Sequence, residues 1–229
     1  MREQPPSLSA KRSYRILYMR SVRDDRTARA VIRDEALRLF AQHGPQAVSI
    51  RQIAAAAGVS AGLVVHHFGS KEALREVVDQ YVLDTFDAML AEMTGRAAPD
   101  LYDPAATGSL VEAVLRHLPA DSPLPAYLRR MLLSDSPAGG QLFGKLFAFS
   151  RQMLAALSQA GMATPGADPA VRAAFLMAND LAVLLLRDRL AEVLGVDPLS
   201  AEGMARWAGE VLAVYGGGLA PGARQGDAS

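Results

Sequence analysis

Cysteine is absent from this sequence, and aromatic residues are scarce. Of the 229 residues, 6% are aromatic and 50% are hydrophobic, and there is a single tryptophan. The lack of cysteine excludes a disulfide framework, a thiolate metal site and a thiol nucleophile. Alanine and leucine dominate the hydrophobic residues, and both favour helix over strand. We therefore expect an all-α protein whose fold depends on packing alone.

A long uninterrupted apolar run is also missing. The most apolar segment, residues 170–186, contains Arg172, Asn179 and Asp180, and no apolar stretch typical of a secretion signal opens the chain. A membrane-spanning helix needs about 20 predominantly apolar residues. These features predict a cytoplasmic protein that has no membrane as a partner.

The sequence has no net charge, but its charges are unevenly distributed. Residues 1–75 contain 13 Lys and Arg against 6 Asp and Glu, whereas residues 76–229 contain 11 against 18. The two parts therefore carry formal charges of +7 and −7. The first part suits a polyanionic partner such as nucleic acid, and the second does not.

Composition and periodicity predict four regions: a flexible basic arm, a small helical domain, a larger helical domain and a disordered tail, over residues 1–26, 27–74, 75–216 and 217–229. The arm contains seven Lys and Arg against three acids. It is an extension that embraces DNA, a vector-derived or mis-started leader with the true start at Met19, or a solvated tail.

The small domain is predicted to be a three-helix helix-turn-helix domain, with helices over residues 27–43, 50–57 and 61–68, and a long fourth helix over 71–93 leads from it into the larger domain. Ser49 and Gln52 form the pattern of a capping box at the start of the second helix, and Gly58 ends it. Ser60 is the expected N-cap of the third helix, which is short.

The second and third helices form a helix-turn-helix if their inner faces pack together. Ile53 and Ala54 face inward, and Gly58 supplies the positive φ that the turn needs. Val59 and Val64 fill the gap between the helices. The alternative is an alanine-rich hairpin without this role, but such a hairpin would seldom place the glycine and both valines in register.

The third helix is suited to the major groove, because Ala61 and Gly62 are small where bases would approach. A glycine costs roughly 1 kcal/mol relative to alanine inside a helix, so Gly62 either avoids a clash with DNA or eases helix crossing. Ser49 and Ser60 begin helices, whose free N–H groups bind phosphate.

The segment "SIRQIAAAAGVSAGLVVHHFGSKEAL", residues 49–74, resembles the DNA-binding domain of the TetR family of bacterial transcriptional repressors. The resemblance covers residues 27–75, and beyond them only helix number and length. It implies that phosphates are held by Ser49, Arg51, His67 and Lys71, and that the groove is met by Ala61, Gly62, Val65 and His66. Such sequences usually have tyrosine at the position of Val65, and valine cannot hydrogen-bond a phosphate.

The adjacent histidines, His66 and His67, do not form a metal site. They point about 100° apart on a helix and therefore cannot chelate one ion as i, i+4 partners do. We expect no metal and no other cofactor. His67 either contacts DNA or packs between helices, and Lys71 either contacts phosphate or is an ordinary solvated residue.

The larger domain is predicted to contain helices over residues 109–118, 124–134, 138–160, 168–194 and 201–215, after an irregular loop over 95–108. By resemblance, the last two helices pair with their copies in a homodimer, as a DNA reader of two-fold operators requires. The expected interface residues are Leu184, Leu185, Leu190, Val193, Trp207, Val211, Leu212 and Tyr215. The alternative for them is an intrachain core.

The same domain is expected to hold a pocket for a small-molecule effector. Its candidate residues are mostly large apolar side chains: Phe86, Met89, Tyr127, Met131, Phe147, Arg151, Phe175, Asn179 and Asp180. Asn179 and Asp180 lie in an apolar helix, where a buried carboxylate is costly without a partner. They bind the effector, bond across the dimer, or pair with Arg151 or Arg187.

The sequence thus predicts a homodimeric regulator that binds double-stranded operator DNA and is released from it by an effector. One alternative is a helical enzyme. The sequence contains no catalytic triad pattern, no glycine-rich phosphate loop and no ligands at metal-binding spacing, which argues against this alternative. The other alternative is a helical interaction module or antirepressor that no longer binds DNA, which the valine at position 65 keeps open.

Overall fold

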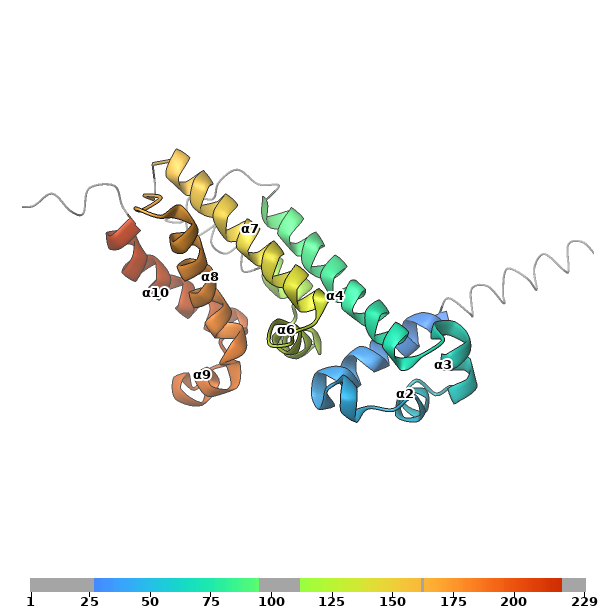
Figure 1. Ribbon diagram of the computed structural model, residues 1–229. Helices are drawn as coiled ribbons and strands as arrows, with labels where there is room; N and C mark the ends of the chain where they lie inside the picture. Colours follow the sequence, from blue (N-terminus) through green and yellow to red (C-terminus); the bar gives the residue numbers. More distant parts are fainter. Residues whose placement is uncertain (1–26, 95–111, 162, 220–229) are drawn as a thin grey trace, which may run out of the picture. The chain divides into compact units, whose positions relative to one another are not determined.

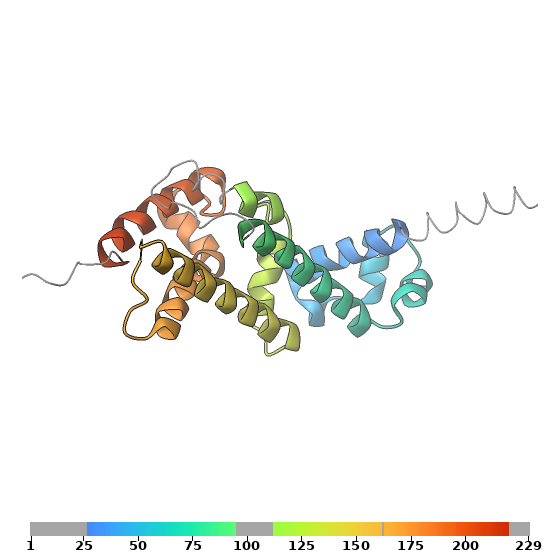
Figure 2. The same cartoon turned by 90° about the horizontal axis from the view of Figure 1, so that it is seen from above.

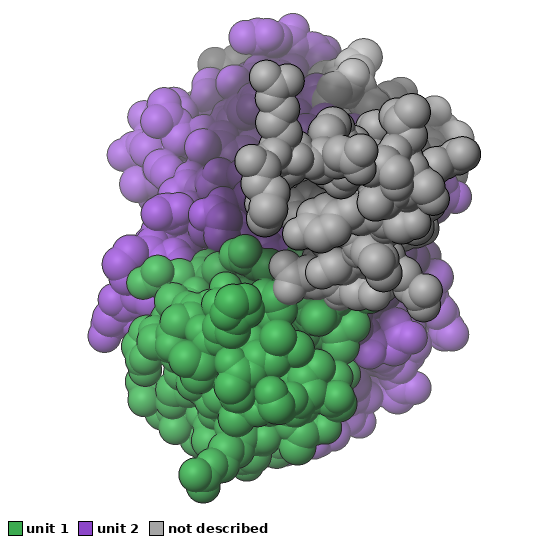
Figure 3. All heavy atoms as spheres, turned by 90° about the vertical axis from the view of Figure 1, so that its right-hand side faces the viewer, with its two compact units in different colours: residues 1–79 green, residues 80–229 purple. Residues whose placement is uncertain are grey.

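A computed structural model describes residues 27–94, 112–161 and 163–219. The expected arm over 1–26 and the whole of the expected loop over 95–108 lie outside these residues. Every regular element within the described ranges is a helix, which confirms the all-α prediction. Two compact units, residues 1–79 and 80–229, divide the chain near the expected domain boundary (Figure 3).

The first unit contains a helix over residues 27–43, the 3-10 turn η1 (Pro45–Ala47), α2 (Ile50–Ala56), α3 (Ala61–Phe68) and the start of α4 (Lys71–Thr94) (Figure 1). One apolar core joins these helices. Its fully buried side chains come from each of the four: Ile32, Phe40, Ile53, Val64 and Leu74. A core drawn from every helix fixes the orientation of the short helices α2 and α3.

The second unit contains the rest of α4, a helix over residues 112–117, α6 (Leu124–Leu132), α7 (Pro137–Gln159), α8 (Pro169–Leu185), α9 (Arg187–Leu194) and α10 (Ala201–Leu219). Helices α7 and α8 lie side by side (Figures 1 and 2). Their contact includes Leu154, Leu157 and Ala173, all buried. Caps at Ser136 and Asp168 set where α7 and α8 begin.

The single helix predicted over 168–194 is wrong, because the chain bends by 75° between α8 and α9 at Leu186. The cause of the bend is a tertiary contact of Arg187. The Arg187 guanidinium binds both carboxylate oxygens of Asp197 and donates to the carbonyl of Ala120 at 2.7 Å. The pKa of the Asp197 carboxyl is lowered by this hydrogen bond. A side chain anchored in this way turns the backbone where the local sequence has no helix breaker.

Helix α10 also differs from its expected bounds, because it continues to Leu219 and includes residues that were predicted to belong to the tail. Within the part of the chain that the structure describes, no helix alone has the length and hydropathy to cross a membrane. The bent pair α8 and α9 meets both criteria only when its two helices are taken together.

Candidate functional site

The N-termini of α2 and α3 are capped by hydrogen bonds to serine side chains. Ser49 Oγ accepts from Gln52 N at 3.3 Å, and Gln52 Oε1 accepts in turn from Ser49 N at 2.8 Å, which completes the capping box. Ser60 Oγ accepts from Leu63 N at 3.1 Å at the start of α3. Such caps contribute about 1 kcal/mol each, so helices of seven and eight residues persist despite their length.

The turn between these helices has the expected geometry. Gly58 has a φ of 66°, in the left-handed region that favours glycine. Val59 N donates to Ala54 O at 2.9 Å, which holds the turn against the end of α2. Ile53 and Val64 are buried between the helices, whereas Val59 is only half-buried. The predicted packing of α2 against α3 is therefore confirmed.

The outer face of α3 is open to solvent. Val65 is 46% exposed, and Gly62 and His66 are also exposed, while Ala61 is half-buried. A Cβ on Gly62 would meet only Ser60 Oγ within 4 Å, at 3.8 Å. Packing within the chain therefore does not require a glycine at this position, and easing of helix crossing does not explain it.

The expected phosphate-binding side chains have different surroundings. Arg51 is exposed on α2. The Lys71 ammonium is half-buried and donates to the carbonyl of Pro45 at 3.0 Å, which leaves two of its protons for another acceptor. The His67 ring is half-buried, with its centroid 6.1 Å from that of Phe68 in an edge arrangement. Arg29 from the first helix lies over the same Phe68 ring at 5.2 Å.

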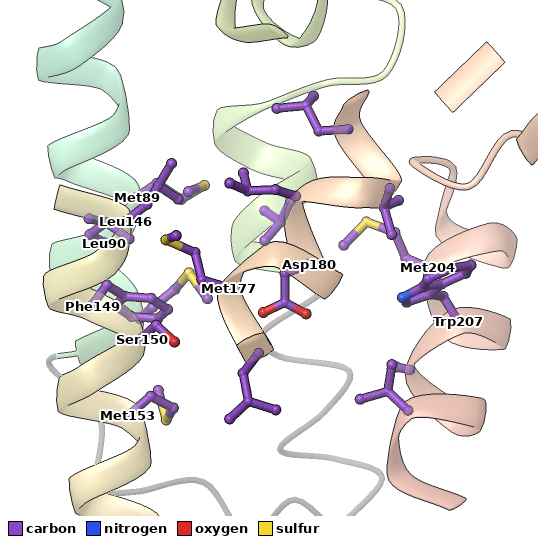
Figure 4. Close-up of a pocket in the computed structure, with 18 of the residues that line it drawn as sticks. Met89, Leu90, Leu146, Phe149, Ser150, Met153, Met177, Asp180, Met204 and Trp207 are labelled. Carbon is purple, nitrogen blue, oxygen red and sulfur yellow. The ribbon is translucent and has the colours of Figure 1, made fainter. Parts of the chain in front are cut away.

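The second unit encloses a cavity of about 480 Å³ between α4, α7, α8 and α10 (Figure 4). Its walls are almost entirely apolar and rich in methionine. The side chains labelled in Figure 4 are Met89, Leu90, Leu146, Phe149, Ser150, Met153, Met177, Asp180, Met204 and Trp207. A volume of this size fits a small organic molecule.

Asp180 is the one ionisable side chain among the described residues that line this cavity. Asp180 is exposed to solvent in the open space of the cavity, but the protein atoms around it reduce the hydration of its carboxylate. This desolvation raises the pKa of Asp180 to about 6, against a smaller lowering by its hydrogen bond with Asn179. Of the alternatives left open for Asp180, a pair with Arg187 is not found, because Arg187 binds Asp197.

Two other polar groups belong to the cavity wall. The Ser150 hydroxyl donates to the carbonyl of Ala173 at 2.8 Å and is thereby satisfied. The indole N–H of Trp207 is buried and has no hydrogen-bond acceptor among the described residues. In Figure 4 the nitrogen edge of this indole faces the space that separates it from Asp180.

The predicted effector residues are only partly brought together. Phe86, Met89 and Asp180 line the cavity. The others lie elsewhere in the unit. Tyr127 and Met131 are buried in the core, and Phe147 packs against the α7–α8 core with Arg151 above its ring. Phe175 is 61% exposed, and Asn179 lines a neighbouring hollow with Arg206.

The predicted dimer residues are divided between two environments. Leu184, Trp207 and Val211 line the cavity, so their side chains are half-buried within one chain. Val193 is 78% exposed on α9, and Leu185 and Leu190 are half-buried. The side chains of Leu212 and Tyr215 lie outside the described residues.

Several cavity residues were not predicted. Leu146, Phe149 and Leu157 on α7 are such residues, and together with Met153 they follow one another at intervals of three and four residues, which is the spacing of one helix face. That period marks an inward face in the sequence. It does not show whether the face meets another helix or an open space, so the pattern alone could not separate cavity wall from core.

Two capped short helices, joined by a glycine turn and presenting one open face, define a helix-turn-helix domain of the kind that transcriptional regulators use to bind DNA. Residues 32–78 match the model of bacterial regulatory proteins of the tetR family, and residues 120–220 match that of the tetracyclin repressor-like C-terminal domain. The chain therefore belongs to the TetR family of transcriptional regulators, which confirms the resemblance found in the sequence.

Among curated proteins, the HTH-type transcriptional regulatory protein RaaS of Mycobacterium tuberculosis (strain ATCC 25618 / H37Rv) is 39% identical over 152 residues. This match covers 66% of the present chain and 67% of RaaS.

Two solved structures share the fold. CprB from Streptomyces coelicolor, in complex with its biological operator sequence, has a TM-score of 0.62 at 23% identity, covering 87% of this chain and 92% of CprB. The SmeT–Triclosan complex has a TM-score of 0.56 at 23% identity, covering 82% of this chain and 91% of SmeT.

Proposed function

We propose that this chain is a homodimeric repressor in the bacterial cytoplasm, which binds a two-fold operator through α3 and leaves it when a small molecule occupies the cavity of the second unit. Two likenesses support this proposal: CprB was solved with its operator, and SmeT with triclosan. The observation that carries the proposal is the exposed face of α3. Packing within the chain does not require a glycine at position 62 of this face.

In this proposal, the N-cap residues of α2 and α3 contact phosphates. Ser49 and Ser60 are exposed and already accept backbone N–H groups. The hydroxyl proton of Ser60 can be donated to a phosphate oxygen, whereas that of Ser49 is donated to Gln52 Oε1 at 2.8 Å and would have to exchange this acceptor for a phosphate oxygen. Arg51 adds an exposed positive charge on α2. Lys71, held in place by the Pro45 carbonyl, has two further protons to donate. These groups would fix the position of α3 on the duplex.

The outer face of α3 then contacts the bases. The exposed Val65 side chain can meet a thymine methyl group in place of the usual tyrosine contact. His66 is exposed beside it and can hydrogen-bond a base edge. Ala61 and Gly62 let the helix backbone come close to the bases.

A homodimer is supported by the apolar surface that one chain leaves exposed. On α8, Val171 is 64% exposed and Phe175 is 61% exposed, one helical turn apart. Such a stripe on a helix favours contact with another protein surface. Two copies would place their α3 helices about 34–36 Å apart for two successive half-sites.

Helix α4 is the proposed route from ligand to DNA. It begins at Lys71, beside the expected phosphate contact, and it contributes Phe86 and Met89 to the cavity wall. A ligand shifts the DNA-binding equilibrium only if it prefers one of two arrangements of this helix. The operator-bound arrangement would then be the one with lower ligand affinity.

Selection of bound fragments from random duplex DNA tests the DNA-binding part of the proposal. We expect an inverted repeat, with log affinity falling linearly as log salt rises. The variant Ser60→Asp keeps an N-cap but adds a negative charge beside the expected phosphate, so the fold should be retained and operator affinity should fall at least about tenfold. Absence of salt-dependent binding would instead favour an interaction module or antirepressor.

The matched control is Ser60→Ala, which removes the cap without adding charge. It should lower the free energy of unfolding by about 1 kcal/mol and weaken operator binding less than Ser60→Asp does. Equal operator affinity of Ser60→Asp and the unmodified protein would remove Ser60 from the DNA contact.

A further inference from the structure

We propose that the ligand of the cavity is a hydrophobic monovalent cation, with its positive charge at the Asp180 carboxylate and its apolar body against the methionine, leucine and phenylalanine walls. This inference rests on the effector function proposed above, and it names the chemical class of the effector.

The charges around the cavity support this choice. Cations on the described helices around the cavity contact another group or line another site: Lys145 pairs with Asp87, Arg187 with Asp197 and Arg129 with Asp188, Arg116 and His117 bond to Glu92, Arg172 bonds to Thr164, Arg151 lies over Phe147, and Arg206 lines the neighbouring hollow with Glu210. None of these side chains lines the cavity, so among the residues that the structure describes Asp180 alone sets the sign of charge inside it.

A ligand that fills the cavity must remove water from Asp180. A neutral apolar ligand would leave the carboxylate covered and without a counter-ion, and covering a charge without a partner is costly. A ligand carboxylate would add repulsion between like charges. A cation instead supplies the missing partner, while its hydrocarbon body contacts walls formed by Met89, Met153 and Met177. Flexible methionine side chains adapt to varied apolar shapes.

The protein contains its own reporter for this binding. Trp207 is the only tryptophan of the chain and lines the same cavity. We therefore suggest titrating the full chain with decylammonium, decyltrimethylammonium, decanol and decanoate, all below their micelle concentrations, while following tryptophan fluorescence. At neutral pH both cations should bind at least about tenfold more tightly than decanol, and decanoate should bind most weakly.

The variant Asp180→Asn keeps the shape of the side chain and removes its charge. It should lose the preference for the cations, with its decanol affinity unchanged or improved. The matched control is Asp188→Asn, which removes the same charge from the exposed ion pair with Arg129 outside the cavity. That variant should keep the preference.

A pH series on the unmodified protein tests the same point if Asp180→Asn does not fold. Decyltrimethylammonium does not titrate, so its affinity follows the ionised fraction of Asp180. Because the pKa of Asp180 is about 6, this affinity should fall about tenfold between pH 7.5 and pH 5. A flat profile would contradict a contact with the carboxylate.

The outcomes separate this inference from the proposed function. Equal affinity for all four molecules, unaffected by Asp180→Asn, would overturn the cation assignment and leave an effector cavity of another chemistry. No fluorescence change with any of them would overturn both the assignment and the cavity as an effector site. The DNA-binding half of the proposed function is measured without any ligand and is independent of either result.

Discussion

The α2–α3 pair and the cavity of the second unit differ in how their polar groups are used. At the α2–α3 pair, the caps Ser49 and Ser60 and the adjacent first residue of α4, Lys71, are each bonded within the chain and are still accessible from outside. In the cavity, Asp180 stands among apolar side chains, and the indole N–H of Trp207 has no acceptor among the described residues.

This contrast indicates two kinds of recognition. A duplex is a rigid, charged partner, so the surface that meets it is held in place before binding, and its internal hydrogen bonds provide that rigidity. In the proposed effector site, a small ligand would bring its own functional group, and the cavity contains a carboxylate that no described cationic side chain neutralises. Substitutions in each region should therefore have separable effects on stability, DNA binding and ligand binding.

The largest expected effect is in the core of the α2–α3 pair. Ile53 is fully buried, so Ile53→Ala should lower the free energy of unfolding by about 2–5 kcal/mol. Urea unfolding would measure this loss, and operator binding should fall with it. Ile50→Ala, at a half-buried position of the same helix, is the control and should cost clearly less. Similar losses for both would mean that Ile53 does not brace α3.

The next effect concerns the start of α10, the helix that contributes Met204 and Trp207 to the cavity. A Cβ on Gly203 would lie 2.1 Å from the carbonyl oxygen of Asp197, so Gly203→Ala must displace the start of α10. We expect a loss of about 2–3 kcal/mol in the free energy of unfolding and a shifted emission from Trp207. Thermal unfolding followed by circular dichroism checks the first, and fluorescence the second.

Gly209 on the same helix is the matched control, because a Cβ there meets nothing within 4 Å. Gly209→Ala should leave stability unchanged or raise it by up to about 1 kcal/mol. A loss as large as that of Gly203→Ala would show that α10 tolerates neither change for reasons of helix geometry, and the steric explanation for Gly203 would fail.

The first unit was predictable because its signals are local. Ser49, Gln52, Gly58 and Ser60 each act within a few residues of their own position, and the observed ends of α2 and α3 agree with them to within about a residue. The exposed outer face of α3 followed from the same short segment, and its contact with DNA stays a prediction. Local chemistry therefore fixed both the elements and the surface that they present.

The second unit was less predictable because its decisive contacts are distant in sequence. The break at Leu186 depends on Arg187 meeting Asp197 and the backbone of Ala120. Similarly, Phe175 looks like a pocket residue by type but faces outward, since the packing of α8 against α7 decides which side is enclosed. Asp180 was the exception, because a carboxylate in an apolar helix is unusual wherever the helix packs.

A smaller effect follows from the titration of Asp180. Its pKa is raised from 3.8 to about 6 in the folded protein, so the unfolded chain loses this proton first as pH rises. The stability linked to the protonated carboxyl is complete below about pH 4 and is lost as pH rises through about 6. Asp180→Asn does not titrate, so its stability relative to the unmodified protein should increase between about pH 4 and pH 7.

After allowance for the exposure of Asp180 to solvent through the cavity, this relative gain should be about 1 kcal/mol. Urea unfolding at several pH values measures it. The control is Asp188→Asn, whose exposed ion pair with Arg129 lies outside the cavity. A difference between Asp180→Asn and the unmodified protein that stays constant with pH would show that the cavity does not desolvate this carboxyl.

The smallest effect on stability should come from Gly62→Ala, and it separates folding from DNA binding. The new methyl group would contact only Ser60 Oγ, at 3.8 Å, so the higher helix propensity of alanine should raise the free energy of unfolding by roughly 0.5–1 kcal/mol. Operator affinity should nevertheless fall, because the methyl group occupies space needed for the approach of α3 to the bases. Unfolding and operator titrations on one preparation compare the two. A more stable variant with undiminished operator affinity would show that this end of α3 does not closely approach the duplex, and the groove-facing surface would then have to lie nearer Val65 and His66.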